Sequence, residues 1–327
     1  MQIPGVYSSL DCLGAEVCEF LAGTSWRQAV CAPLTGDASA RRYFRLRADG
    51  QTAMLMDASR ARECVAPFHQ LALHLRRLGF SAPEVFHWCA KRGLMLIEDF
   101  GEQSFTRLLD GGAEEEPLYA LATDVLAALH QQAGAVPARW RVYDPQKMLE
   151  DLELFLEWRA PGLASRGRAA FCAAWRQVLP LAHRVPQSLL LRDYHVANLM
   201  LLPEREGLRR AGLLDFQDAY AGPVTYDLVS LLQDARRELP EPLQATMLAR
   251  YLAACPAPSA DDFAASLAIL AAQRHTRVLG IFERLSLRDG KHEYKRRHSP
   301  RVERLLRRAL EHPALGPVKN WFSRYAD

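Results

Sequence analysis

The chain has 327 residues, of which 49% are hydrophobic, and a formal net charge of +3. This length and hydrophobic content suffice for two domains with their own cores, and so small a net charge argues against a protein whose main role is to bind nucleic acid. No apolar run approaches the roughly 20 residues that cross a bilayer, and residues 1–10 lack the features of a signal peptide. We therefore expect a cytoplasmic protein without a membrane or nucleic-acid partner.

The cysteines give no sign of a disulfide framework or of a zinc site. There are seven of them, an odd number, at positions 12, 18, 31, 64, 89, 172 and 255. Their wide spacing contains no CxxC pair, which zinc sites commonly use, and an odd number of scattered cysteines does not suit a disulfide framework. We expect reduced thiols, some of them buried.

The first third of the chain predicts a small sheet with one helix. A polar turn over residues 34–40 precedes an alternating strand at 41–46, and a second strand follows at 53–57. Apolar residues at helical spacing predict a helix over residues 61–78, and an apolar strand at 94–98 comes next. We place the boundary of this region after residue 99.

Helices dominate the remainder. Residues 118–129 carry an apolar stripe that we assign to the core, and Asp144 with Pro145 predicts the start of a helix that continues through Leu156. Residues 284–308 contain ten Lys or Arg against three Asp or Glu. Because leucines recur there at helical spacing, a solvated helix face is a better interpretation than a surface for nucleic acid or membrane.

Two short motifs carry the residues that indicate chemistry. Asp193 and Asn198 lie five positions apart on a tight loop between apolar segments, and Asp215 follows a second short apolar strand. Either motif alone is compatible with an ordinary polar turn, but their order along the chain favours a phosphotransferase. Phosphoryl transfer needs a carboxylate beside the acceptor hydroxyl and oxygen ligands for Mg²⁺. We predict that Asp193 orients and deprotonates the acceptor, and that Asn198 and Asp215 bind the metal.

These motifs resemble those of the aminoglycoside phosphotransferase-like kinases. The resemblance extends over residues 34–232 and rests on Leu214-Asp215-Phe216-Gln217-Asp218-Ala219, Gly222-Pro223 and Tyr226-Asp227-Leu228. It implies an α+β, two-lobed protein-kinase-like fold, with ATP as phosphoryl donor and Mg²⁺ as cofactor. The nucleotide-covering N-lobe would be a small antiparallel sheet of residues 1–99. The mostly helical C-lobe, residues 100–327, would hold the catalytic loop, the metal site and the acceptor pocket.

The resemblance also implies a nucleotide site. Gly36, Asp37 and Ser39 lie where the family has its phosphate-covering loop, although a single glycine makes this a weak motif and a plain hairpin turn is the alternative. The backbone at Glu98 and Phe100 would bind the adenine edge. In such kinases the Asp that corresponds to Asp227 is structural and anchors the loop after the metal site.

Two residues depart from the family pattern. Leu191 replaces the usual His before the catalytic Asp, and Met56 stands where a phosphate-binding Lys is expected. Arg41, Arg42 and Arg45 follow the polar turn and could replace that Lys, because guanidinium groups bind phosphate well. We predict Arg42 as the substitute.

One branch of the family is especially similar, the bacterial kinases that phosphorylate the anomeric hydroxyl of N-acetylmuramate and N-acetylglucosamine in peptidoglycan recycling. This resemblance implies a small amino sugar as the acceptor, and we expect a monomer. We expect acceptor contacts from His195, Gln217, Asp218, Arg274 and Arg277. His195 could equally be a packing residue of the loop. The two arginines suit an anionic substituent, and Glu150, Glu153 and Trp158 could line the same pocket.

Several alternatives stay open. An aminoglycoside kinase would need an acidic pocket, which the Arg-rich second half of the chain disfavours. A choline or homoserine kinase shares the catalytic motifs, and choline would need an aromatic or acidic cation site. The absent Lys also admits a pseudokinase that binds nucleotide without turnover, but the presence of Asp193, Asn198 and Asp215 together argues against it.

Overall fold

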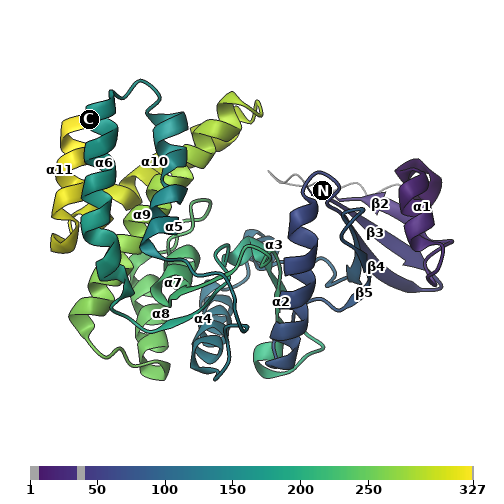
Figure 1. The fold of residues 1–327 in the computed structure, drawn as a ribbon. Coiled ribbons are helices and arrows are strands. Elements are labelled where there is room, and N and C mark those ends of the chain that lie inside the picture. Colours follow the sequence, from purple (N-terminus) through teal and green to yellow (C-terminus); the bar gives the residue numbers. More distant parts are fainter. Residues whose placement is uncertain (1–6, 35–40, 326–327) are drawn as a thin grey trace. The chain divides into compact units, whose positions relative to one another are not determined.

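The computed structural model describes residues 7–34 and 41–325 (Figure 1). The chain divides into two compact units. The first comprises Met1–Ala113 and Val196–Asp218, and the second comprises Glu114–His195 and Ala219–Asp327. The division therefore falls within the loop that joins Asp193 to Asn198. The lobe boundary after residue 99 stays a prediction, because the compact units divide at other positions.

A six-stranded antiparallel sheet forms the centre of the first unit. Its strands lie in the order β1, β2, β3, β4, β6, β5. Their bounds are β1 (Ser8–Ser9), β2 (Val30–Pro33), β3 (Arg42–Ala48), β4 (Gln51–Asp57), β5 (Val85–Cys89) and β6 (Leu94–Glu98). The strands expected at 41–46, 53–57 and 94–98 are thus confirmed as β3, β4 and β6.

Two helices cover opposite faces of this sheet. Phe44 and Leu55 are paired across β3 and β4, and both pack with the apolar side of α1 (Ala15–Leu21). Side chains alternate along a strand, so Met56 points to the other face. Trp88 lies on the same face, because Met56 and Trp88 both pair with Met95 of β6. His69 of α2 (Val65–Arg77) stacks on the ring of Trp88, with ring centroids 4.4 Å apart. The helix predicted over residues 61–78 is therefore α2, which begins four residues later than expected.

The remainder of the first unit is a short helix and a hairpin. Helix α3 spans Phe105–Asp110, and the hairpin consists of β8 (Leu199–Leu201) and β9 (Ala211–Leu213). The N–H of Leu213 donates to the carbonyl of Ser81 at 2.7 Å. At Gly212 a Cβ atom would lie 2.7 Å from the ring of Phe100, so glycine lets the hairpin pack directly against that ring.

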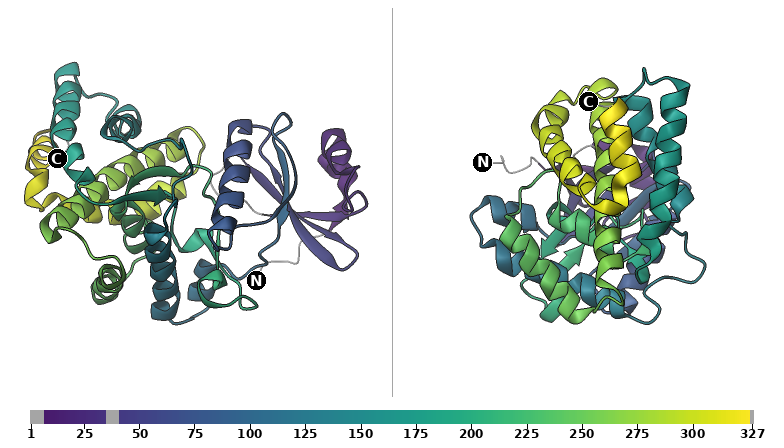
Figure 2. Two further views of the ribbon diagram at one scale, coloured as in Figure 1. Left: turned by 60° about the horizontal axis from the view of Figure 1, so that its bottom comes forward. Right: turned by 90° about the vertical axis from the view of Figure 1, so that its left-hand side faces the viewer.

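The second unit is mostly helical (Figures 1 and 2). Its helices are α4 (Glu115–Gln131), α5 (Pro145–Asp151), α6 (Ser165–Val178), α7 (Thr225–Leu232), α8 (Glu241–Ala254), α9 (Ala260–Leu287), α10 (His292–Leu310) and α11 (Gly316–Tyr325). Two strands, β7 (Gln187–Leu190) and β10 (Tyr220–Pro223), pair antiparallel. Helix α11 lies beside α6, where Trp321 donates from Nε1 to the carbonyl of Gly167 at 2.9 Å.

Helix α9 crosses the core of this unit, and its path explains one difference from the sequence prediction. The helix expected from Asp144 through Leu156 ends at Asp151 as α5, and a π-helical turn follows at Phe155–Arg159. A Cβ at Gly280 of α9 would lie 2.5 Å from the carbonyl carbon of Leu154. Glycine therefore allows α9 to pass directly against the backbone at the break. The predicted N-cap is confirmed, because the Asp144 carboxylate accepts the N–H of Lys147 at 2.8 Å.

The basic C-terminal stretch forms the end of α9 and most of α10. Helix α10 buries Val302, Leu305, Leu306 and Leu310, while most of its arginines are exposed, namely Arg296, Arg297, Arg304, Arg307 and Arg308. This is the amphipathic helix that the leucine spacing predicts. None of the seven cysteines forms a disulfide within the part of the chain that the structure describes. Within residues 7–34 and 41–325, no helix combines the length and apolarity needed to cross a membrane.

Candidate active site

The loop that carries Asp193 is held from below by a buried carboxylate. Asp227, on α7, accepts the backbone N–H of Leu191 at 2.6 Å and that of Arg192 at 2.9 Å. Arg192 adopts a left-handed backbone conformation with φ of 67°, which a non-glycine residue keeps only when its surroundings fix it. Asp227 thus has the structural role expected of it, but the loop it anchors is the one before the metal motif.

Asp193 is set among positive charges within the second unit. Burial favours the neutral form of its carboxyl, but the charges of nearby cationic groups outweigh this effect and lower its pKa below the ordinary value. Arg277 contributes most, followed by His195, Arg192 and Arg274. The carboxylate is therefore ionised at neutral pH and able to accept a proton or a hydrogen bond from a hydroxyl.

His195, next on this loop, is buried and held by an arginine. Arg236 donates from Nη1 to its Nε2 at 3.2 Å. Burial, with the charges of Arg236 and Arg274, lowers the pKa of the imidazole, although Asp234 and Asp193 oppose this. A neutral ring that accepts at Nε2 carries its proton on Nδ1, and that buried atom has no hydrogen-bond partner among the described residues. Its role toward a substrate stays a prediction.

The two arginines predicted to bind substrate have different environments. Arg274 is buried in α9 and donates from Nη2 to the hydroxyl of Ser230 on α7 at 2.9 Å. Arg277, nearly one turn further along, keeps 22% of its side chain exposed and makes an ion pair of 3.4 Å from Nε to Asp151. Only Arg277 therefore presents its charge to solvent.

The metal motif lies in the first unit, at the end of the β8–β9 hairpin. The N–H of Leu214 donates to the carbonyl of Asn198 at 3.0 Å, and Asp215 follows with φ of 59°. This turn brings the Asn198 amide to 3.4 Å from Oδ2 of Asp215. Sequence reasoning placed these two residues around one ion, and the hairpin brings them together.

The surroundings of Asp215 fit a hard cation. Its carboxylate also accepts from Nε2 of Gln217 at 2.9 Å, and Gln217 donates in turn to the exposed Asp218 at 3.2 Å. A carboxylate and an amide oxygen are ligands that Mg²⁺ accepts, and in nucleotide enzymes phosphate oxygens and water complete its coordination. No group of three or more His, Cys, Asp or Glu side chains suited to a metal occurs in the described part of the chain. Protein ligands alone would therefore not form a complete cage here.

The pairing of β3 with β4 helps to decide whether Arg41 or Arg42 would replace the missing Lys. Tyr43 pairs with Met56, so residues 41 and 43 share the face of Met56, and Arg42 lies on the opposite face. Arg41 makes an ion pair with Asp215 and keeps 12% of its side chain exposed. Arg42 pairs instead with Asp57 at the edge of the strand and is 67% exposed. The ion pair thus places Arg41 beside the metal motif, a position that the sequence alone could not decide.

The expected adenine-binding segment is the end of β6. The N–H of Glu98 donates to the carbonyl of Glu84 at 2.8 Å, and its carboxylate is paired with Arg76 and Arg205. Phe100 packs with Met200 and Leu202. The backbone roles of Glu98 and Phe100 stay predictions, and Gly36, Asp37 and Ser39 lie outside the described residues.

Asp151 is a residue that sequence reasoning missed. The sequence suggests its neighbours Glu150 and Glu153 as pocket residues, whereas Asp151 is the carboxylate that contacts Arg192 and Arg277. Its spacing from Lys147 was the one signal available, since residues four apart on a helix face each other. Contacts from a distant loop and from α9 leave no trace in the local pattern.

An ionised carboxylate, followed along the chain by an amide and a second carboxylate, is the set of residue types that a phosphotransferase of the protein-kinase fold uses. The chain matches the model of the phosphotransferase enzyme family over residues 30–265, and it belongs to that family. It is 34% identical to the N-acetylmuramate/N-acetylglucosamine kinase of Caulobacter vibrioides over 94% of each chain. It is 36% identical to the protein of the same name from Neisseria meningitidis over 83% of each chain.

Solved structures of the same fold include the choline kinase LicA from Streptococcus pneumoniae. The TM-score is 0.61 at 15% identity, with coverage of 84% of this chain and 94% of that one. Identity this low supports the fold alone. The predicted protein-kinase-like fold, with a small antiparallel sheet and a mostly helical remainder, is confirmed.

Proposed function

We propose that this chain is an ATP-dependent kinase that phosphorylates the anomeric hydroxyl of N-acetylmuramate, N-acetylglucosamine or both, giving the sugar 1-phosphate in cell-wall recycling. The observation that carries the proposal is the similarity to an N-acetylmuramate/N-acetylglucosamine kinase over 94% of each chain. The chemistry of the Asp193 loop and of the Asn198–Asp215 pair supports it independently.

In this proposal Asp193 acts on the acceptor. An anomeric hydroxyl is more acidic than an ordinary alcohol, so it does not require a strong base. The cations that lower the pKa of Asp193 make it a weak base that stays ionised. Such a group accepts a hydrogen bond from the hydroxyl, orients its oxygen toward the phosphorus, and takes the proton late in the transfer.

The first unit would act on the donor. Asn198 and Asp215 would hold Mg²⁺, which neutralises charge on the phosphates of ATP when bound. We propose Arg41 as the phosphate-binding cation because it lies on the face of Met56 and beside Asp215, and we keep Arg42 as the alternative. The nucleotide contacts of Gly36, Asp37, Ser39, Glu98 and Phe100 belong to the same proposal.

Acceptor contacts are proposed for His195, Gln217, Asp218, Arg274 and Arg277. His195 has support from its buried Nδ1, which meets no described hydrogen-bond partner. Arg274 is occupied by Ser230, so it would act mainly through its charge on Asp193. Asp218 is exposed and Gln217 links it to Asp215.

The charges around Asp193 weigh against the alternative acceptors. Aminoglycosides and choline are cations, and Arg277, Arg192 and Arg274 would repel them from the base. A pseudokinase has no need of a carboxylate held ionised beside the acceptor site. An amino sugar that is neutral or carries a carboxylate meets no such repulsion.

The test is ADP release from Mg-ATP with N-acetylmuramate, N-acetylglucosamine or kanamycin as acceptor, for wild type and Asp193→Asn. We expect turnover of a sugar and not of kanamycin, and a loss of about 10²- to 10⁴-fold in kcat in the variant. Activity on kanamycin alone would overturn the acceptor but leave the phosphotransferase. Absence of all turnover, with retained nucleotide binding, would support the pseudokinase.

We further propose a cytoplasmic monomer, with its N-lobe ending at residue 99. The proposal is motivated by the absence of a membrane-spanning helix among the described residues and by the soluble class of the substrate. Light scattering during size-exclusion chromatography tests the monomer, and a mass well above 36.8 kDa would contradict it.

A further inference from the structure

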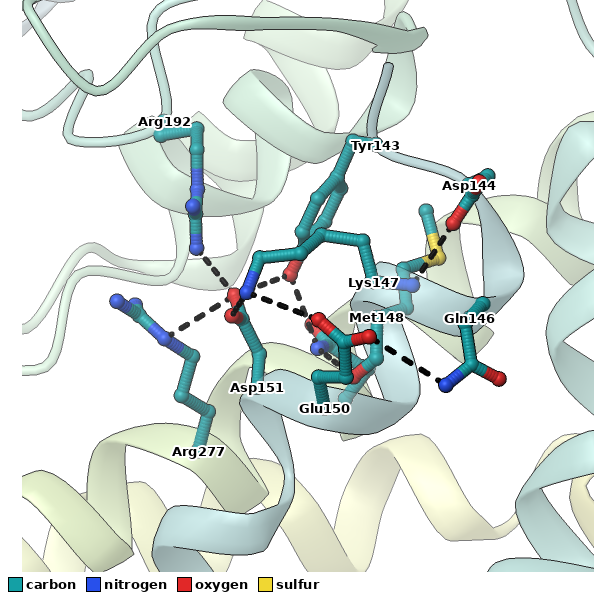
Figure 3. Close-up of polar contacts among 10 residues, drawn as sticks. Tyr143, Asp144, Gln146, Lys147, Met148, Glu150, Asp151, Arg192 and Arg277 are labelled. Carbon is teal, nitrogen blue, oxygen red and sulfur yellow. Dashed lines mark hydrogen bonds and ion pairs between the residues drawn. The ribbon is translucent and has the colours of Figure 1, made fainter. Parts of the chain in front are cut away.

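A cluster of three cations converges on one carboxylate in the second unit. Asp151, the last residue of α5, accepts a hydrogen bond from Tyr143 Oη at 2.9 Å on Oδ2. The same oxygen forms ion pairs with Arg277, at 3.4 Å from Nε, and with Arg192. Lys147, one turn earlier on α5, lies 3.1 Å from Oδ1. Figure 3 shows these side chains pointing toward one another from α5, the catalytic loop and α9.

The cluster has a buried layer and an exposed layer. The side chain of Asp151 is 10% exposed, and that of Arg192 is buried. Lys147 and Arg277 keep 34% and 22% of their side chains exposed. The Asp151 carboxylate is therefore buried beneath Lys147 and Arg277, and the surface of the cluster that faces solvent is mainly positive. Glu150, at 3.4 Å from Lys147, is the other acidic group on this helix that faces the cluster, and Figure 3 shows it turned toward Gln146 and Lys147.

Arg192 connects the cluster to the catalytic carboxylate. It directly precedes Asp193, and its guanidinium lies 4.7 Å from the centroid of Tyr143 and 5.1 Å from that of Tyr220. Cation–π stacking between two rings fixes this side chain. Arg192 and Arg277 meet the same oxygen of Asp151, and the charge of Arg277 is also the one that acts most strongly on Asp193.

The Nε atom of Arg277 is oriented by Asp151, while its two terminal amino groups are available to a ligand. Its Nε contacts Asp151, and within residues 7–34 and 41–325 the two terminal amino groups make no ion pair or hydrogen bond. These two groups form the fork that binds a carboxylate with two parallel hydrogen bonds. A side chain whose Nε is already held loses less freedom when a ligand binds.

We propose that Arg277, assisted by Lys147, binds a carboxylate substituent of the acceptor, and that Asp151 is the positioning residue that aims Arg277. The inference rests on the proposed function and deepens it. The cluster selects N-acetylmuramate, which carries a lactyl carboxylate, over N-acetylglucosamine, which does not. Arg274 has no part in this contact, because it is buried and engaged with Ser230.

The test compares three acceptors with wild type and Arg277→Met: N-acetylmuramate, its methyl ester and N-acetylglucosamine. The ester removes the charge of the acid and adds only one methyl group. We expect wild type to prefer the acid over the ester by at least about tenfold in kcat/KM, the typical scale of a charge-assisted contact. In Arg277→Met this preference should fall to near unity. The ratio of kcat/KM for N-acetylmuramate to that for N-acetylglucosamine should fall by a similar factor.

Three further variants complete the experiment. Asp151→Asn should reduce the acid-over-ester preference, because the amide no longer holds Arg277 by charge. It should also lower kcat for all three acceptors, because Asp151 holds Arg192 beside Asp193. Lys147→Met should reduce the preference less, and this partly exposed residue offers a variant with little risk to folding. Arg288→Met is the matched control: it removes one positive charge from the end of α9, where Arg288 is exposed and paired with Asp289. Its preference should equal that of wild type.

The outcomes separate this inference from the proposed function. If wild type phosphorylates the sugars but Arg277→Met loses the acid and the ester equally, or Arg288→Met shows the same loss of preference, the inference is overturned and the kinase stands. Turnover of N-acetylglucosamine without N-acetylmuramate would likewise overturn it. If neither sugar is a substrate of wild type, the proposed function fails and this inference fails with it.

Discussion

The surroundings of Asp193 and Asp215 differ in where their partners come from along the chain. Asp215 is set by its own hairpin, since Asn198 and Gln217 are near in sequence, and Arg41 is its one distant partner among the contacts described. Asp193 owes its ionised state chiefly to Arg277, more than 80 residues away on α9, and its loop is fixed by Asp227. Local sequence thus shapes the metal site, while helix packing shapes the base.

This difference predicts distinct consequences of removing each carboxylate. We expect Asp193→Asn and Asp215→Asn each to lower kcat by about 10²-fold or more, because one removes the base and the other a metal ligand. Thermal unfolding separates them. Mg-ATP should raise the melting temperature of wild type and Asp193→Asn, and raise that of Asp215→Asn little. Equal stabilisation of both variants would show that Asp215 does not support nucleotide binding.

The buried anchor of the Asp193 loop should make stability depend on pH. Burial raises the pKa of Asp227 to about 7 from 3.8, although two backbone N–H groups oppose the shift. A raised carboxyl pKa contributes stability at low pH that is lost as pH rises toward 7. Over this range, the free energy of unfolding of wild type should fall relative to Asp227→Asn by an amount on the order of 4 kcal/mol, and the difference should be constant above about pH 8. Urea unfolding of both proteins from pH 4 to 9 measures it, and a difference that does not vary with pH would contradict the raised pKa.

Substitution of Arg41, the ion-pair partner of Asp215, should have the smallest of these effects. Arg41→Met should raise the dissociation constant of Mg-ATP by about tenfold or more, the scale of one charge-assisted contact to phosphate. Arg42→Met is the matched control, because it changes the neighbouring residue on the opposite face of β3. Isothermal titration with a non-hydrolysable ATP analogue distinguishes them. A larger effect in Arg42→Met would restore the assignment made from the sequence.

How far the sequence could predict this molecule follows from the same contrast. The strands β3, β4 and β6, the N-cap at Asp144 and the Asn198–Asp215 pair arise from neighbouring residues, and each could be predicted. The choice between Arg41 and Arg42 depends on the pairing of Tyr43 with Met56 across two strands. Alternation along a strand places neighbouring residues on opposite faces, but it could not say which face the metal motif would meet.

Partners far apart in the chain explain what the sequence could not provide. Asp151 looked like one of several acidic residues on a surface helix, and only folding brings Arg192 and Arg277 to it. Similarly, no local signal marks Leu154 as the place where Gly280 passes over the backbone and the predicted helix gives way to a π-helical turn.

The double attachment of Arg192 has a consequence for how such an enzyme could change its substrate. Its backbone is fixed by Asp227 and its side chain by Asp151, so one residue links α5 and α7 through the catalytic loop. A substitution at Asp151 that altered acceptor preference would also disturb the loop that carries the base. Lys147 has no such link to the loop backbone, whereas Arg277 acts on Asp193 through its charge. Evolution toward a new acceptor, in nature or in the laboratory, should therefore begin at Lys147 and leave Arg277 and Asp151 unchanged until late.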